Sequence, residues 1–490
     1  MKYKVYGIIS LCLAFIIITA SICFFRKDED RQRYHQHLMA EPKTECSHSE
    51  DTFCTHLPLI QIDTGGTAIP GKVNNGDYLN PTVTEDGETR IICDIKVTDN
   101  EKTNNHVADD PSVESRAYIN VRGRSSRGFD KTGYRIDLIT EQGDNNPKKL
   151  AGMDPHHEWV LHGPFLDKTL IRNYMWYNVA GEIMDYAPNV RFCEVIINGE
   201  YMGVYVLTEN ITAGKDGTRL NLSVDRKDNS FTGYLLRMDA GSTNPIKNID
   251  TFSVYSGRFP NKVDIVYPGA TNLTTEMAEN IRQDFSKFEK TLYSFDYDSN
   301  KYGYQTMIDV DSFVDYFIIN EFATNYDAGW LSTYIYKDID GKFKMCIWDF
   351  NSACDNYQEK SIEPKGFLFQ YCVWYTMLMK DEDFTEKIIE RYSELRKTYL
   401  SDEYLNQYIE STINYLGDAV KRNFDKWGYT FSDEHALLAP IDRNLHSYDE
   451  AVSALKSNIA ARGEWLDENI HTLRQYSAES KVKKYNEHTD

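Results

Sequence analysis

Two aspartates flank a predicted β-hairpin in the second half of this 490-residue chain. Asp327 and Asp349 lie on either side of the stretch STYIYKDIDGKFKMCIW, which is rich in β-branched and aromatic residues around Asp340-Gly341. Such a pair is typical of a two-residue type I′ turn, and that turn places Ser332 opposite Asp349. Two carboxylates and a hydroxyl at one end of a hairpin can bind a divalent metal ion and act as acid or base. The alternative is structural: the first aspartate ends a turn and the second ends a strand.

A group of basic residues lies upstream, in the stretch VRGRSSRGFDKTGYRIDL that begins at Val121. It is unusual because the whole chain carries a formal net charge of -21. Its glycines allow the backbone to approach a ligand closely and its serines offer hydroxyls, so the stretch could bind phosphate groups. The structural alternative is a strand edge protected by charge. The residues concerned are Arg122, Arg124, Ser125, Ser126, Arg127, Lys131 and Arg135.

Composition excludes several classes of protein. The acidic charge and a pI of about 5.1 argue against a general nucleic-acid partner, because most of the surface would repel a phosphate backbone. The sequence contains no C-x-x-C, H-E-x-x-H, G-x-S-x-G or Walker A motif, so a zinc ribbon, a metalloprotease, a nucleophile elbow and a P-loop are not predicted.

The N-terminus predicts an anchor. The apolar run from Val5 to Phe25 is long enough to cross a bilayer as a helix, and it lacks a small-x-small cleavage site. Basic residues on both sides leave its orientation open, and we expect the folded part to be extracytoplasmic. Residues 26–56 form a polar stalk in which Cys46 and Cys54 are close enough for a disulfide in an oxidising compartment.

The remaining chain divides by pattern. Residues 57–245 contain short alternating or β-branched runs separated by turn residues and are expected to be a β-rich part with one helix. Residues 246–475 are expected to be mainly helical and to contain the hairpin with its aspartates, and residues 476–490 to be a flexible tail.

Local signals fix several element boundaries. Asn198-Gly199 between β-rich arms predicts a tight hairpin. Asp167 precedes an apolar stripe with helical spacing and is a suitable N-cap. Ser447, with Glu450 three residues later, forms a capping box and predicts the start of the last helix.

Five stretches of the chain resemble the CotH kinases, atypical protein kinases related to spore-coat protein H. They are YINVRGRSSRGFDKTGYRIDL, LDKTLIRNYMWYNVAGEIM, FCEVIINGEYMGVYVLTENI, GYLLRMD and the hairpin stretch with its flanking aspartates, in the family's order. The resemblance covers about Leu57 to Leu473. It implies an α+β fold of the atypical protein-kinase-like type, with a β-rich N-terminal lobe and a helical C-terminal lobe. In this chain the transmembrane helix predicted from the apolar run precedes that fold.

The resemblance also implies roles for the acidic end of the hairpin. Asp327 would be the catalytic aspartate near the acceptor hydroxyl, and Asp349 the metal-binding aspartate. Ser332 takes the place of the asparagine that holds a second metal ion in ordinary protein kinases. Asn351 stands where family members often have another aspartate, and it completes the set of metal-binding candidates.

The nucleotide-binding candidates come from the same resemblance. Lys131 is the candidate for the phosphate-contacting lysine, with Arg122, Ser125 and Arg135 beside it in sequence. Either Glu182 or Glu209 would pair with this lysine, and the sequence leaves that choice open. The cofactors implied are ATP and Mg²⁺, with Mn²⁺ as a substitute.

The function implied is transfer of the ATP γ-phosphate to Ser or Thr of a protein substrate by a membrane-anchored enzyme. The partners would therefore be ATP, the acceptor protein and the membrane. The main alternative, favoured by Asn351, is a catalytically silent surface or envelope protein that keeps the fold to bind a partner. A metal-dependent hydrolase using the same aspartates is a third reading.

Overall fold

The computed structural model describes residues 33–44, 46, 52–73, 77, 80–214, 219–224, 230–251 and 262–477. The chain forms two compact units, Met1–His35 and Gln36–Asp490, and the elements named below belong to the second. The predicted anchor, Val5 to Phe25, and the end of the predicted tail lie outside the described residues. Within the described ranges, no helix is long and apolar enough to cross a membrane.

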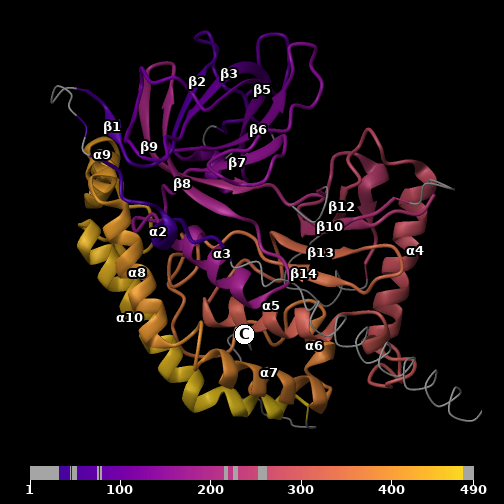
Figure 1. Ribbon diagram of the computed structural model, residues 1–490. Coiled ribbons are helices and arrows are strands. Elements are labelled where there is room, and N and C mark those ends of the chain that lie inside the picture. Colours follow the sequence, from indigo (N-terminus) through magenta and orange to yellow (C-terminus); the bar gives the residue numbers. More distant parts are fainter. Residues whose placement is uncertain are drawn as a thin grey trace, which may run out of the picture. The chain divides into compact units, whose positions relative to one another are not determined.

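Seven strands close into a barrel in the order β2-β3-β5-β6-β7-β9-β8 (Figure 1). All neighbours are antiparallel except β2 and β8, whose parallel pairing closes the barrel. The strands are β2 (Leu59–Asp63), β3 (Ile91–Thr98), β5 (Val113–Arg122), β6 (Gly133–Ile139), β7 (Glu158–His162), β8 (Val190–Ile197) and β9 (Glu200–Glu209). A separate pair, β1 (Cys54–Thr55) and β4 (Asn105–His106), is also antiparallel. The disulfide predicted between Cys46 and Cys54 is not formed, because both cysteines are free thiols.

Strand β8 is buried along its whole length because it serves two cores. Alternate side chains of a strand point to opposite faces. Cys193 and Val195 therefore belong to the barrel interior, whereas Phe192 belongs to the second core, where its ring lies 4.1 Å from that of Tyr174. Tyr174 is part of α3 (Arg172–Ile183), so this helix covers the outer face of β8.

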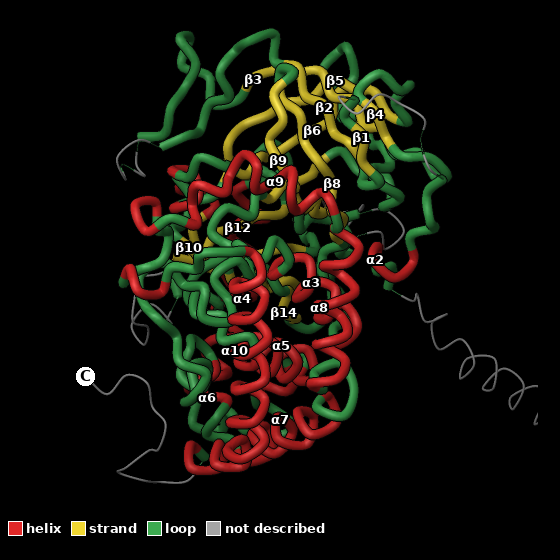
Figure 2. The backbone as a smooth tube through the Cα atoms, turned by 90° about the vertical axis from the view of Figure 1, so that its left-hand side faces the viewer, coloured by secondary structure: helices red, strands yellow, loops and turns green. Residues whose placement is uncertain are grey.

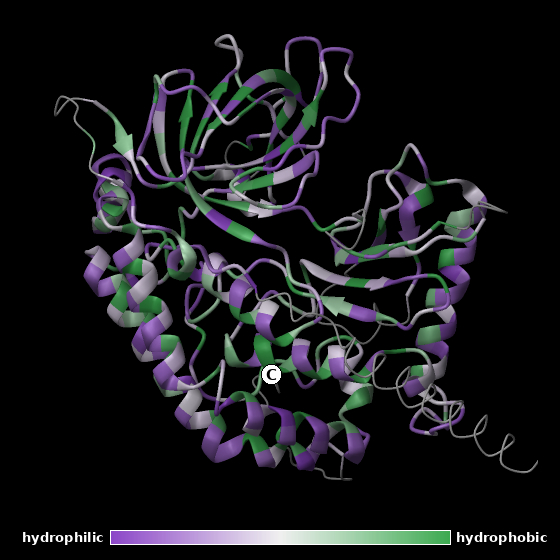
Figure 3. Ribbon diagram, in the orientation of Figure 1, coloured by the Kyte–Doolittle hydropathy of each residue, from purple (hydrophilic) through white to green (hydrophobic). Residues whose placement is uncertain are grey.

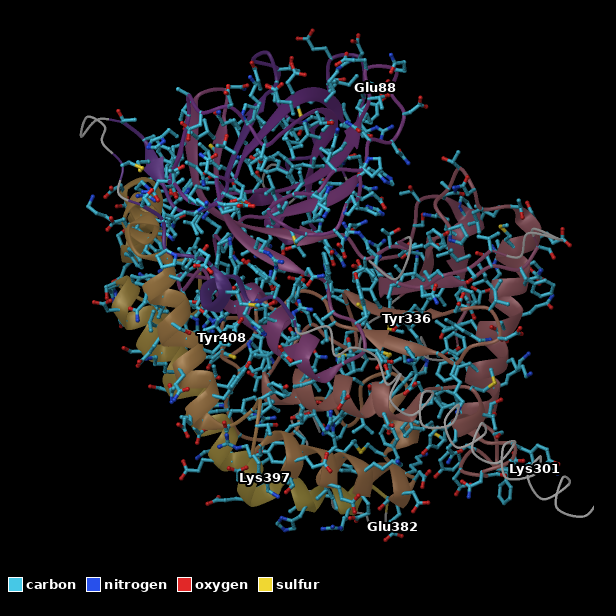
Figure 4. All side chains as sticks on the ribbon, viewed as in Figure 1. Glu88, Lys301, Tyr336, Glu382, Lys397 and Tyr408 are labelled. Carbon is cyan, nitrogen blue, oxygen red and sulfur yellow. The ribbon has the colours of Figure 1, made fainter. Side chains whose placement is uncertain are left out.

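A second sheet of five strands has the order β11-β12-β10-β13-β14. It joins the predicted hairpin, β13 (Thr333–Lys337) and β14 (Lys344–Cys346), to β10 (Tyr234–Asp239), β12 (Lys262–Tyr267) and β11 (Asn248–Ile249). Tyr336 of β13, labelled in Figure 4, pairs with Lys344 of β14. The hairpin is thus the edge of a larger sheet, and β10, from the part predicted as residues 57–245, lies beside it.

Most helices belong to the later part of the chain, and helices are the red segments of Figure 2. In Figure 3, polar and apolar residues alternate around α8 and α10, and the large apolar residues of both helices are buried or half-buried. The α-helices are α2 (Gln36–Met39), α3, α4 (Thr275–Leu292), α5 (Val310–Phe322), α6 (Tyr375–Leu378), α7 (Glu382–Leu395), α8 (Asp402–Leu416), α9 (Asp418–Trp427) and α10 (Tyr448–Asn469). Short 3₁₀ helices are η1 (Ser125–Gly128), η3 (Pro245–Lys247), η5 (Tyr304–Thr306), η6 (Gly428–Phe431), η7 (Asp433–His435), η8 (Ile441–Arg443) and η9 (Ile470–Tyr476).

Local signals in the sequence predicted several boundaries correctly. Ile197 pairs with Glu200 across the Asn198-Gly199 turn, which confirms the predicted hairpin. The capping box is also confirmed: the Ser447 side chain accepts a hydrogen bond from the Glu450 amide at the start of α10. Helix α3 begins later than predicted, at Arg172, although the Asp167 carboxylate still accepts its amide at 2.8 Å. The α+β class is confirmed by the barrel, the sheet and the helices together.

Candidate active site

Asp327 lies in a tight loop directly after α5. The loop is held by its own backbone: the amide of Ala328 donates to the carbonyl of Asn325 at 3.1 Å, and the amide of Leu331 donates to the carbonyl of Asp327 at 2.8 Å. Asn325 is fully buried, whereas Asp327 is half-buried. The carboxylate of Asp327 therefore sits on a fixed backbone and keeps some access to solvent.

Asp349 follows β14 and is fixed by α3. Its amide donates to the hydroxyl of Tyr177 at 2.9 Å, and the next amide, of Phe350, donates to the Asn173 side chain at 2.6 Å. Its carbonyl accepts a hydrogen bond from the Asn325 side chain at 3.2 Å, which ties it to the Asp327 loop. With φ at +62°, Asp349 leaves the extended path of β14.

The predicted register of the hairpin is wrong by one residue. Tyr334 pairs with Cys346, and the positive φ falls on Asp340 without Gly341, so the turn is not type I′. Ser332 nevertheless lies beside Asp349, with 3.5 Å between hydroxyl and carboxylate oxygens. The loop conformation produces this contact, because Ser332 has a φ of +48° and lies outside the strand.

A third carboxylate, Asp239 at the end of β10, adds its charge to the same place. Burial, followed by the charges of Asp349, Asp239 and Glu359, raises the pKa of Asp327 to about 7, against the opposing effect of Arg124. Burial and Asp239 also raise the pKa of Asp349. Sequence reasoning missed Asp239, although it ends the stretch GYLLRMD; a polar residue directly after an apolar strand was the available signal.

Two arginines counter this acidic group. Arg122, at the end of β5, acts with Ser332 to lower the pKa of Asp349, and its guanidinium lies 5.3 Å from the centre of the Trp348 ring. Arg124 lies 4.0 Å from the Asp239 carboxylate. The loop from the barrel thus brings positive charge to the acidic end of the second sheet.

Ser125 belongs to the same loop, in η1, and is exposed. The sharp turn into η1 needs Gly123, whose φ is +115° and whose position leaves no room for a β-carbon beside the Ser126 hydroxyl. Arg124 and Ser125 are therefore two exposed polar residues on one short loop.

The structure does not bring the other basic candidates into this group. Lys131 is buried, and its ammonium donates to Asn423 of α9 at 2.7 Å. Burial lowers the pKa of Lys131 well below its usual range. Arg135 forms ion pairs with Asp137 and Glu158 on the barrel.

Glu209 is not the partner of Lys131. It is buried at the end of β9, where its carboxylate accepts the backbone amide of Asn189 at 2.9 Å and lies 3.8 Å from Arg219. The charge of Glu182 affects Tyr404 of α8. Burial is the main cause of the raised pKa of Tyr404, and Glu182 contributes to the same rise. We expected Glu182 or Glu209 to pair with the Lys131 ammonium. In the part of the chain that the structure describes, this ammonium is hydrogen-bonded to Asn423 instead.

The oxygen donors near Asp349 suit a hard divalent cation. Besides the carboxylate and the Ser332 hydroxyl, Oδ1 of Asn325 is buried and has no hydrogen-bond partner among the described residues. Asn351 lies two residues after Asp349, and its Nδ2 donates to the Ser352 hydroxyl at 3.5 Å. The carboxylates of Asp239, Asp327 and Asp349 do not form a group with all ligand atoms within 4.8 Å, in the described part of the chain. Mg²⁺ does not require such a cage, because it usually keeps water and phosphate oxygens in its coordination shell.

Comparisons with known proteins concern the family of this chain. A family model described as CotH kinase protein matches residues 119–466, a range that contains the Arg122 loop, Asp239, Asp327 and Asp349. The inner spore coat protein H of Bacillus subtilis (strain 168) is 22% identical over 362 residues, which cover 72% of this chain and 87% of the relative. The resemblance predicted from sequence stretches is confirmed: the chain belongs to the CotH kinase protein family.

Proposed function

We propose that this chain is an ATP- and Mg²⁺-dependent atypical protein kinase that transfers the γ-phosphate to Ser or Thr of a protein. The observation that carries the proposal is the meeting of Asp327, Asp349 and Ser332 on two adjacent, rigidly held loops. The proposal includes a kinase-like division into a β-rich lobe with the barrel and a helical lobe with the second sheet.

The two aspartates have separate tasks in this proposal. Asp349 and the Ser332 hydroxyl would hold Mg²⁺ or Mn²⁺, with Oδ1 of Asn325 as a further oxygen donor. When bound, the ion would neutralise charge on the transferred phosphate. Asp327 would orient the acceptor hydroxyl and take its proton, a task that suits a half-buried carboxylate whose pKa is about 7. Asn351 is the third metal candidate and would offer its Oδ1, since its Nδ2 donates to the Ser352 hydroxyl.

The phosphates would bind at the loop that follows β5. Arg122 is the strongest candidate because its charge acts on Asp349, and Ser125 and Arg124 lie on the same short loop. Lys131 keeps the role that the family pattern suggests only if its ammonium can share or leave Asn423 when ATP binds. Arg135 and Glu209 would act indirectly, through the ion pairs that support the barrel strands.

The name of the relative supports a location for this activity. Because that relative is an inner spore coat protein, we propose an envelope or surface location and an acceptor protein in the same place. The single-pass anchor at Val5 to Phe25, with the folded part outside the cytoplasm, stays part of this proposal.

The test uses the full-length protein with labelled ATP, Mg²⁺ and casein as a general acceptor, and autophosphorylation is followed in parallel. We expect Asp327→Asn and Asp349→Asn each to lower phosphate transfer by about 100-fold or more, since each removes a charge required at the reacting centre. Asp340→Asn is the matched control, because Asp340 lies exposed at the other end of the same hairpin. Equal transfer by all three variants and the wild type would contradict the assignment.

A catalytically silent binding protein is the second candidate, and two observations favour it. Lys131 is engaged by Asn423, and Asn351 replaces a carboxylate while its amide contacts Ser352. Thermal unfolding with and without Mg-ATP separates the candidates. A kinase should be stabilised by Mg-ATP, and Asp349→Asn should remove the metal-dependent part of that shift; a silent protein that has lost the site should show no such shift.

A further inference from the structure

Asp239 is a carboxylate of the candidate active site that has no task yet in the proposed reaction. It ends β10, the central strand of the second sheet, and β10 pairs with β13. Met238 lies opposite Thr333 in this antiparallel pair, and continuing the register by one residue brings Asp239 next to Ser332. The Ser332 hydroxyl is in turn 3.5 Å from the Asp349 carboxylate. Three neighbouring strands, β10, β13 and β14, therefore bring two acids and a hydroxyl to one end of the sheet.

The Asp239 carboxylate is oriented by its own chain and keeps one oxygen for a ligand. Oδ1 accepts the backbone amide of Ala240 at 2.7 Å and lies 4.0 Å from a guanidinium nitrogen of Arg124. The hydrogen bonds among the described residues leave Oδ2 of Asp239 without a donor. The side chain is 22% exposed, so this oxygen is within reach of solvent and ions. Carboxylate oxygens of this kind are the ligands that hard divalent cations prefer.

Two further observations indicate that this end of the sheet receives a cation. Asn325 is 1% exposed, its Nδ2 donates to the Asp349 carbonyl at 3.2 Å, and its Oδ1 has no hydrogen-bond partner among the described residues. The charges of Asp349 and Asp239 both reach Asp327, although burial is the main cause of the raised pKa of Asp327. A buried oxygen without a donor and closely spaced negative charges are both unfavourable, and a bound cation relieves both.

Arg124 compensates the charge of Asp239 from the barrel. It lies on the loop between β5 and η1, directly after Gly123, and its side chain is 59% exposed. An exposed ion pair at 4.0 Å contributes little, because water screens both charges. The pair can therefore be exchanged for stronger partners. Arg124 belongs to the loop proposed for the ATP phosphates and Asp239 lies beside the proposed metal ligands, so Mg-ATP offers each residue a partner of opposite charge.

We propose that Asp239 is a further ligand of the divalent cation and that Arg124 is its partner only until Mg-ATP binds. This inference rests on the proposed function, because the cation and the phosphates are those of the kinase reaction. The Arg124 guanidinium leaves Asp239 for a phosphate oxygen, and the freed carboxylate binds the cation together with Asp349. One weak ion pair is thereby replaced by two stronger contacts. Asp239 supplies the second carboxylate of the centre, which Asn351 cannot supply.

The experiment measures cation binding and nucleotide binding separately in the full-length protein. Mn²⁺ alone is titrated and followed by electron paramagnetic resonance, and Mg-ATP binding is measured by isothermal titration calorimetry. Asp239→Asn should weaken Mn²⁺ binding by about 10-fold or more, since it removes a charge close to a divalent ion. Arg124→Gln should act in opposite directions on the two ligands. It should strengthen Mn²⁺ binding by about 2- to 5-fold, the contribution of one exposed ion pair, and weaken Mg-ATP binding by about 10-fold.

A second ion pair of the barrel provides the matched control. Arg116 and Glu141 lie 3.3 Å apart and their side chains are 31% and 75% exposed, so Arg116→Gln and Glu141→Gln should leave both affinities unchanged. In an Asp239→Asn background, Arg124→Gln should no longer strengthen Mn²⁺ binding, because its effect depends on the Asp239 charge.

The inference fails if Asp239→Asn binds Mn²⁺ as the wild type does while Asp349→Asn does not. It also fails if Arg124→Gln leaves Mn²⁺ binding unchanged or weakens it. Circular dichroism identifies a variant that does not fold, and in that case the opposite changes expected for Arg124→Gln decide. A wild-type protein that binds neither Mn²⁺ nor Mg-ATP would instead refute the proposed function itself.

Discussion

Gly203 of β9 lies against Asn423 and Trp427 of α9, and this contact allows a quantitative prediction. A β-carbon at this position would lie 2.5 Å from Oδ1 of Asn423 and 3.0 Å from Nε1 of Trp427. That oxygen accepts hydrogen bonds from Lys131 at 2.7 Å and from the amide of Val204 at 3.1 Å. Gly203→Ala should therefore push Asn423 away and leave the buried ammonium of Lys131 without its partner.

A second glycine on the same hairpin separates backbone strain from this collision. Gly199 has a φ of +81° and Gly203 a φ of +102°, but nothing lies within 4 Å of a β-carbon at Gly199. Gly199→Ala should cost about 1–3 kcal/mol, the usual strain of a side chain at positive φ. Gly203→Ala adds the loss of a hydrogen bond to a charged group, about 1.5–3 kcal/mol, and should cost about 2.5–6 kcal/mol in total.

Urea unfolding of the full-length variants measures this difference. In an Asn423→Ala background the hydrogen bonds are already lost and the closest contact is removed, while Trp427 remains, so Gly203→Ala should then cost about 1.5–3 kcal/mol less than in the wild type. The reasoning is refuted if Gly203→Ala and Gly199→Ala agree within about 0.5 kcal/mol, or if Asn423→Ala leaves the cost of Gly203→Ala unchanged.

Two further predictions concern buried charge. The pKa of His156 is lowered from 6.5 to about 3, chiefly by burial and then by Arg219. As the pH falls below 6.5, His156 takes up a proton in the unfolded chain but not in the folded protein. The contribution of neutral His156 to the free energy of unfolding is therefore complete above pH 6.5 and is lost toward pH 3, by about 1.4 kcal/mol per pH unit. Urea unfolding of His156→Gln at several pH values should lack this one-proton slope; an unchanged slope contradicts the assignment. Arg462 and Glu321 form a fully buried ion pair, so Arg462→Met should cost about 3–5 kcal/mol. Arg474→Met, at the exposed pair with Glu386, should cost no more than about 1 kcal/mol, and equal losses would refute this contrast.

The hairpin shows which structural features a local sequence pattern predicts correctly and which it does not. The alternating arms predicted both strands, and the two aspartates were correctly expected at one end of them. The register was wrong by one residue because an Asp-Gly pair favours a type I′ turn only when both residues take positive φ, and here only Asp340 does. The expected contact between Ser332 and Asp349 is nevertheless present. Both residues lie outside the paired strands, so the contact depends on the conformation of their loops and not on the register of the hairpin.

Partners of charged residues were harder to predict. The sequence predicted Glu182 or Glu209 as the partner of Lys131. In the structure the Lys131 ammonium is hydrogen-bonded to Asn423, almost three hundred positions later in the chain. Glu209 forms an ion pair with Arg219 instead, and both side chains are buried. Sequence spacing carries no information about such pairs, since they depend on which helices and strands pack together.

The sequence by itself determined what depends on neighbouring residues: the strands and helices, the Asn198-Gly199 turn, the cap at Ser447 and the motifs that identify the family. Short-range hydrogen bonds and backbone preferences specify these features, and they act within a few residues. Only the tertiary structure decided that Asp239 joins the two aspartates, that Arg122 faces them, and that Arg124 pairs with Asp239. These groups come from separate elements, and long-range packing of barrel, sheet and helices brings them together.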